Sequence, residues 1–151
     1  MSYKRILVAI DGSKTSTLAF KEALYLAKKL QAKLCIIHII ERLPDHIAYA
    51  IDVVKYQMLA NKKGEMLLEK FYKLATKNKV KAETKFIEIQ GFKESVSKKI
   101  LQTTKSWRAN LLVMGTHGRT GFNRLLLGSV AEETLKTATK PILLVRSKEA
   151  E

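Results

Sequence analysis

Short apolar runs alternate along this chain with longer amphipathic segments, and this alternation restricts the fold more than any other feature. The apolar runs predict strands at residues 3–10, 33–40, 81–90, 110–114 and 142–145. Between them, apolar residues recur every three or four positions, which predicts helices at residues 15–30, about 44–79, 95–106 and 129–139, with Gly64 as a break or weak point in the second. Strict alternation predicts an α/β fold of parallel βαβ units with right-handed crossovers.

The length of 151 residues predicts a single domain, 1–151, large enough to bury a hydrophobic core. No apolar run approaches the roughly 20 residues of a membrane helix, and the first strand begins directly after the N-terminus, so we expect neither membrane insertion nor secretion. The single cysteine, Cys35, has no partner for an internal disulfide and lies in an apolar strand. This is typical of an inert core residue and predicts a cytoplasmic location.

The chain is strongly basic, with 28 Lys and Arg against 14 Asp and Glu and a formal net charge of +14. The lysines are dispersed over many segments, and solvated surfaces account for such a distribution. The alternative is an anionic partner, either nucleic acid or a nucleotide drawn in by the positive field.

A glycine-rich loop follows the predicted fourth strand and leads toward the last helix. It reads Gly115-Thr116-His117-Gly118, then nine residues, then Gly128-Ser129. Glycines allow backbone N–H groups to approach phosphates, and a helix N-terminus adds a partial positive charge. The layout predicts a phosphate site. The alternative interpretation is that these glycines only form ordinary turns.

Asp11 follows the first strand, and the two loops would meet if the first and fourth strands are neighbours. It has two interpretations, as the N-cap of the next helix or as a ligand of a ribose, an adenine or a divalent ion. His117, Arg119 and Arg124 are candidate phosphate contacts, with a mobile loop position as the alternative for His117 and plain surface positions for the two arginines. We expect Trp107 to pack at the end of the third helix.

Several catalytic motifs are missing from the sequence. It contains no G-x-x-x-x-G-K-[ST], no complete G-x-G-x-x-G after the first strand, no C-x-x-C and no G-x-S-x-G. No carboxylate lies between Ala109 and Val130, so Asp11 and Glu132 are the acidic candidates nearest the loop. Hydrolysis needs a group that activates or positions water. We therefore expect nucleotide binding with little or no rapid catalysis.

The glycine loop and its spacing to Gly128-Ser129 resemble the ATP-binding signature of the universal stress protein family. The opening apolar strand with Asp11-Gly12-Ser13, the strand end at residues 38–40, the run at 125–129 and the ending at 141–146 support the resemblance over nearly the whole chain. It implies a single Rossmann-like domain with a five-stranded parallel sheet of order 3-2-1-4-5, flanked by helices on both faces. It also implies a homodimer paired through the last strand, residues 142–146. The aspartate common in the family before the fourth strand is Asn110 here.

The resemblance also implies roles for individual residues. Ala9, Ile10 and Asp11 would lie beside the adenosine, and the backbone of Ile39 near the adenine ring. Ribose and phosphates would be held by Met114, Gly115, Gly118, Gly128, Ser129 and Val130. The ligand implied is ATP, with AMP or another adenine nucleotide as alternatives, and with Mg²⁺ or Mn²⁺ as a companion ion.

The sequence is therefore compatible with three functions. The first is an ATP-binding stress-response or signalling module. The second is a slow ATPase or phosphotransferase that uses the same site. The third is association with nucleic acid through the dispersed lysines, for which the sequence holds no motif.

Overall fold

The computed structural model describes residues 2–44, 46, 51–117 and 126–148. Five strands and four helices alternate along these residues, as predicted. Their bounds are β1 Arg5–Ile10, α1 Lys14–Leu30, β2 Lys33–Arg42, α2 Ile51–Lys77, β3 Ala82–Gln90, α3 Val96–Ser106, β4 Leu111–Gly115, α4 Ser129–Thr137 and β5 Ile142–Val145.

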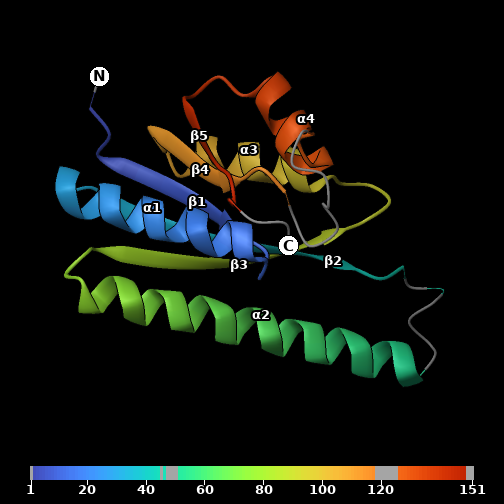
Figure 1. The fold of residues 1–151 in the computed structure, drawn as a ribbon. Helices are drawn as coiled ribbons and strands as arrows, with labels where there is room; N and C mark the ends of the chain where they lie inside the picture. Colours follow the sequence, from blue (N-terminus) through green and yellow to red (C-terminus); the bar gives the residue numbers. More distant parts are fainter. Residues whose placement is uncertain (1, 45, 47–50, 118–125, 149–151) are drawn as a thin grey trace.

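The strands form one parallel sheet of order β3-β2-β1-β4-β5, which confirms the predicted α/β fold (Figure 1). The chain moves outward from β1 through β2 to β3, and α1 and α2 cover one face of the sheet. It then crosses back to β4 and β5, and right-handed crossovers in that direction place α3 and α4 on the other face. The reversal of strand order lies between β1 and β4, where this kind of sheet opens a crevice.

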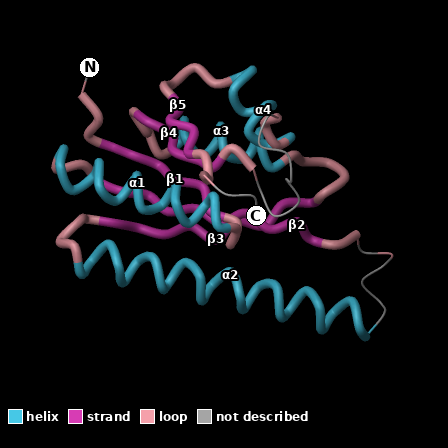
Figure 2. Tube along the Cα trace, viewed as in Figure 1, coloured by secondary structure: helices cyan, strands magenta, loops and turns pink. Residues whose placement is uncertain are grey.

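Each face of the sheet has its own hydrophobic core, because successive strand residues point to opposite faces. Ile6, Val8 and Ile10 pack toward α1 and α2, where Phe20 and Phe71 stack with ring centroids 4.2 Å apart. The other core contains Leu7, Cys35, Ile37, Ile100, Trp107, Leu112 and Met114. Figure 2 shows the resulting layers of helix, sheet and helix.

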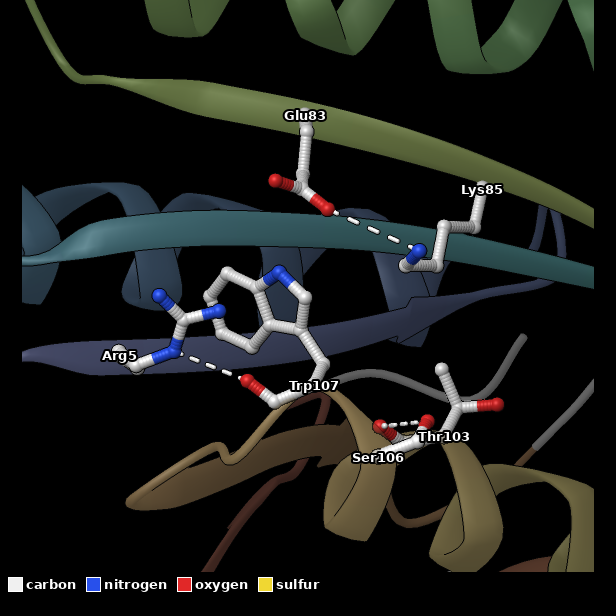
Figure 3. A network of polar contacts seen from close by, with 6 residues as sticks. All are labelled: Arg5, Glu83, Lys85, Thr103, Ser106 and Trp107. Atoms are coloured by element: carbon white, nitrogen blue, oxygen red, sulfur yellow. Dashed lines mark hydrogen bonds and ion pairs between the residues drawn. The ribbon is translucent and has the colours of Figure 1, made fainter.

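Trp107 ends α3 and is tied to the start of β1, as expected for a packing residue. Arg5 Nε donates a hydrogen bond of 2.9 Å to the carbonyl oxygen of Trp107 (Figure 3). The guanidinium carbon of Arg5 also lies 4.0 Å from the centroid of the indole ring, a cation–π contact. These two contacts join the C-terminal end of α3 to the N-terminal end of β1.

Cys35 is fully buried on β2, which confirms its interpretation as a core residue. Burial, assisted by the nearby Glu83 carboxylate, raises the pKa of the Cys35 thiol to about 12. The thiol is therefore protonated and unreactive at neutral pH.

Gly64 does not break the second helix, so the first of its two interpretations, a break, is wrong. Helix α2 runs without interruption from Ile51 to Lys77. A Cβ atom at Gly64 would lie 2.6 Å from Cδ2 of His38 and 2.8 Å from Cε2 of Phe86. The glycine therefore lets α2 approach β2 and β3 closely. Residues 47–50, also expected to be helical, lie outside the described residues.

None of the helices in the described segments is long and apolar enough to cross a membrane.

Candidate functional site

A cavity of about 250 Å³ opens at the carboxyl ends of β1 and β4. The two strands are paired neighbours, with Ile6 opposite Leu111 and Val8 opposite Val113, so their loops meet as the sequence predicts. The predicted site residues gathered in its wall are Ala9, Ile10, Asp11, Ile39, Met114, Gly115, Gly128, Ser129 and Val130. Gly118, Arg119 and Arg124 lie outside the described residues.

The inner wall of the cavity is apolar. Ile37 and Ile39 of β2, Met114 of β4, and Val96 and Ile100 of α3 contribute it. The polar residues of the wall come from the loop after β1 and the first turn of α1, from the loop after β4, and from the start of α4. An apolar wall with a few polar groups at one side is the usual composition of a site for a small organic molecule.

Asp11 lies at the rim but does not cap α1. Its Oδ1 atom accepts a hydrogen bond of 2.9 Å from the backbone N–H of Ser13, and Ser13 Oγ is the group that caps the helix, accepting 3.1 Å from Ser16 N. Gly12 adopts φ 86°, a conformation that favours glycine and turns the chain sharply between the two. Of the two interpretations, the N-cap is excluded. Asp11 Oδ2 accepts no hydrogen bond from any described residue.

Gly115 is required by packing within the protein. A Cβ atom there would lie 2.7 Å from Thr15 Cγ2 and 3.1 Å from the backbone carbon of Thr15. The glycine therefore brings the end of β4 against the first turn of α1. This adds a structural reason to the predicted one, that glycine lets a phosphate approach the backbone.

Helix α4 begins at Ser129 with its first turn facing the cavity rim. Its N-cap is Gly128, at φ −62°, and no side chain caps the helix. The N–H groups of Ser129, Val130 and Ala131 belong to the turn in which an α-helix has no internal acceptors. The loop is held in place by hydrogen bonds from Gly128 N to Thr116 O, 2.7 Å, and from Thr116 N to Val145 O, 2.9 Å. The first turn of α4 is thus held in a defined position, with the backbone geometry that suits an anion.

His117 lines the cavity, as its interpretation as a phosphate contact requires. Its Nδ1 atom lies 3.0 Å from Thr116 Oγ1. Its Nε2 atom is buried and has no hydrogen-bond partner within the part of the chain that the structure describes. A buried polar atom without a partner is costly, so a ligand group that bonds Nε2 would be favoured.

Sequence reasoning missed part of the cavity wall. Ser16, Ile37, Val96, Ile100 and Ala131 line it but were not selected as site residues. The sequence signal of the four apolar residues is membership of an apolar strand or helix face, and Ser16 carries none beyond its place in the first turn of α1. The ends of their elements are brought to the cavity by packing alone.

Acidic groups are scarce here. Asp11 is the one carboxylate among the described residues of the wall, and the other acidic candidate, Glu132, pairs with Lys136 at 3.1 Å outside it. In the described segments no three His, Cys, Asp or Glu side chains gather as metal ligands. Among the described residues of the wall, Asp11 is the carboxylate that could hold a divalent ion together with oxygens of a bound ligand, an arrangement that Mg²⁺ accepts beside phosphates.

The fold is shared with solved structures. A universal stress protein family member from Burkholderia pseudomallei is 28% identical, with a TM-score of 0.77 over 96% of this chain and 97% of that one. A universal stress protein in complex with cAMP is 20% identical, with a TM-score of 0.71 over 97% and 98% of the two chains. A family protein from Arabidopsis thaliana with AMP bound is 20% identical, with a TM-score of 0.69 over 96% and 92%.

Sequence comparison identifies the family. A universal stress protein of Methanocaldococcus jannaschii is 33% identical over 99% of this chain and 85% of its own length. A universal stress protein of Bacillus subtilis is 32% identical over 95% of this chain and 99% of its own length. The sequence profile of the universal stress protein family matches residues 2–146. The chain therefore belongs to the universal stress protein family.

Proposed function

We propose that this protein is an ATP-binding universal stress protein, a nucleotide-dependent module of the stress response or of signalling. It holds ATP, or AMP or another adenine nucleotide, in the cavity between β1 and β4. The observation that carries the proposal is the joint presence of an apolar wall, Asp11 and the uncapped first turn of α4 in one cavity. Family members bound to cAMP and AMP support an adenine nucleotide as the ligand.

The proposal assigns the two ends of the nucleotide to different walls. The adenosine lies against Ala9, Ile10 and Ile39, and Asp11 accepts hydrogen bonds from it. Ribose and phosphates are held by the remaining predicted residues, which are Met114, Gly115, Gly118, Gly128, Ser129 and Val130. Mg²⁺ or Mn²⁺, where present, is shared between the phosphates and Asp11.

The same proposal covers the assembly and location of the protein. Residues 1–151 act as a single domain in the cytoplasm, and two chains form a homodimer through residues 142–146. Strand β5 supports this pairing, because it is the edge strand next to β4 and all its residues are half-buried. An unpaired edge strand offers backbone groups to a second chain.

A thermal-shift measurement tests nucleotide binding. At 100 times its dissociation constant, ATP·Mg should add about 2.7 kcal/mol to the free energy of unfolding, and a chain of this length should then melt roughly 5 to 10 °C higher. Gly128→Val should abolish the shift because its side chain enters the rim, and its φ of −62° suits valine. Unchanged melting of the wild-type protein with millimolar ATP·Mg would contradict the proposal.

The identity of the nucleotide has its own experiment. Mass spectrometry of the small molecules released from purified, denatured protein should find an adenine nucleotide. A different class of molecule retained at stoichiometric amounts would remove ATP binding from consideration.

Slow hydrolysis is the second candidate, favoured by one observation. Asp11 lines the cavity, its Oδ2 atom has no hydrogen bond to the described residues, and this oxygen could accept a proton from water. Single-turnover assays decide between the two functions. Intact ATP after hours of incubation supports binding alone, and phosphate release that depends on Asp11 supports the slow enzyme.

A further inference from the structure

A second hollow lies at the opposite end of the strands from the candidate nucleotide cavity, on the side where the strands begin. Its volume is about 750 Å³, and its wall is built from the C-terminal ends of α3 and α4 and the start of β4. It shares no residue with the candidate nucleotide cavity. We call it the basic hollow.

Positive charge dominates the basic hollow. Lys105, Arg108 and Lys140 line it, and its wall contains no carboxylate among the described residues. All three cationic residues are exposed, and none forms an ion pair with any residue in the described segments. Elsewhere lysines pair with neighbouring glutamates, as Lys73 does with Glu69 at 3.1 Å. The three cations are therefore available to an anion.

Asn110 adds an oriented donor to this wall. Its Oδ1 atom accepts hydrogen bonds from the backbone N–H groups of Lys4, 3.0 Å, and Arg5, 2.8 Å. These bonds fix the carbonyl side of the amide and leave the Nδ2 amino group with no hydrogen bond to the described residues. An aspartate could accept the same two bonds but would place a negative charge in the wall. Asparagine keeps the hollow free of negative charge.

We propose that the basic hollow binds a multivalent phosphate anion, either inorganic oligophosphate or a small oligophosphorylated molecule. An Arg guanidinium and two Lys ammonium groups match an anion that carries several charges. Thr139, Gln102 and the Asn110 amino group supply neutral donors. The net charge of +14 raises the local concentration of such anions around the whole protein.

The carbonyl groups at the C-terminal ends of α3 and α4 also attract these cations. That attraction alone would make the residues helix-stabilising and nothing more. The two roles differ in measurable ways, because a helix-stabilising cation affects unfolding but does not create saturable anion binding.

Isothermal titration calorimetry with sodium tripolyphosphate, at roughly 0.15 M ionic strength, tests the proposal. Wild-type protein should bind saturably. Asn110→Asp should weaken binding at least about threefold, because it adds one like charge near the anion while keeping the acceptor for Lys4 and Arg5. Lys140→Glu should weaken it about tenfold or more. Arg108→Asn should also weaken it and should fold, because Arg108 adopts φ 58° and asparagine tolerates that conformation.

Two control variants distinguish binding in the basic hollow from a general charge effect and from binding in the nucleotide cavity. Lys62→Glu on α2 makes the same charge change as Lys140→Glu away from the hollow, and it should change binding less than twofold. Gly128→Val should leave tripolyphosphate binding intact, so a failed ATP proposal and a failed phosphate proposal give different results. Three results would overturn the proposal: no saturable binding, equal weakening by Lys62→Glu, or loss of binding in Gly128→Val. Tighter binding of a short single-stranded oligonucleotide than of tripolyphosphate would also overturn it, in favour of nucleic acid.

Discussion

At the scale of single residues, Asp11 has two separate tasks. One carboxylate oxygen shapes the turn by accepting from Ser13 N, and the other accepts no hydrogen bond from the part of the chain that the structure describes. The turn task needs only an acceptor, whereas a ligand hydroxyl or a metal ion gains from the negative charge. A substitution that keeps the acceptor and removes the charge can separate the two tasks.

Asp11→Asn is therefore expected to fold normally and to bind ATP about fivefold more weakly. The reason is that a hydrogen bond to a charged acceptor contributes about 1 kcal/mol more than one to a neutral acceptor. Titration calorimetry measures the change. Asp52→Asn, which removes a charge at the start of α2, is the matched control, and equal weakening by both variants would show that Asp11 has no specific contact.

Cys35 gives a second prediction at this scale. Burial raises the pKa of its thiol from 9.0 to about 12, so the folded chain keeps the proton more tightly than the unfolded chain. The associated stability is fully present below pH 9 and is lost as the pH rises from 9 toward 12, because only the unfolded chain ionises there. Denaturant unfolding between pH 8 and 11 should show a steeper loss of stability for the wild type than for Cys35→Val. Parallel curves would contradict the raised pKa.

At the scale of elements, helix α2 is positioned by the absence of a side chain at Gly64. The helix crosses β2 and β3 where His38 and Phe86 fill the space that a Cβ would need. His38 in turn lies 2.9 Å, through Nδ1, from the carbonyl oxygen of Ile10, the residue before Asp11. The close approach of α2 thus supports the end of β1 that carries the candidate site.

Gly64→Ala should reveal this packing. In an exposed helix the change stabilises by about 1 kcal/mol, but here overpacking should destabilise the protein by about 1 to 3 kcal/mol. Urea unfolding measures the difference. The control is Glu65→Gly at the next position, which is exposed, because it gives the loss of unfolding free energy that a glycine ordinarily causes in a helix. A Gly64→Ala variant more stable than the wild type would mean that α2 lies farther from the sheet.

At the scale of the whole molecule, the two hollows lie at opposite ends of the strands of one sheet. The candidate nucleotide cavity lies at the carboxyl ends of the strands, and the basic hollow lies at the ends where the strands begin. The strand β5 that we propose as the dimer contact lines neither hollow, but its two ends bond to residues that do. Thr116 of the nucleotide cavity wall donates to Val145 O, and Leu112 of the basic hollow donates to the oxygen of Pro141, the residue before β5.

The proposed dimer can be tested by sedimentation equilibrium. Wild-type protein should be a dimer at micromolar concentration, and Leu143→Lys on β5 should shift it toward monomer, because a lysine on an edge strand opposes pairing. Leu135→Lys on the exposed side of α4 is the control and should remain dimeric. A wild-type monomer at these concentrations would exclude pairing through residues 142–146.

The order of elements and the parallel sheet follow from sequence alone. These properties depend on information that is local in the chain: apolar periodicity reports an element's type, and regular alternation leaves few topologies. The meeting of the loops after β1 and β4 depends on these two strands being neighbours. That strand order is implied by the resemblance to the universal stress protein family, not by periodicity, and the structure confirms it.

Tertiary structure alone decided which residues complete these sites. Ser13 rather than Asp11 caps α1, Gly64 lets α2 approach the sheet, and Ile100 reaches the nucleotide cavity from a distant helix. The basic hollow likewise joins Lys105, Asn110 and Lys140, whose lysines appear in the sequence only as part of a dispersed charge. Such choices depend on close packing between segments far apart in the chain, and periodicity carries no information about which side chains will meet there.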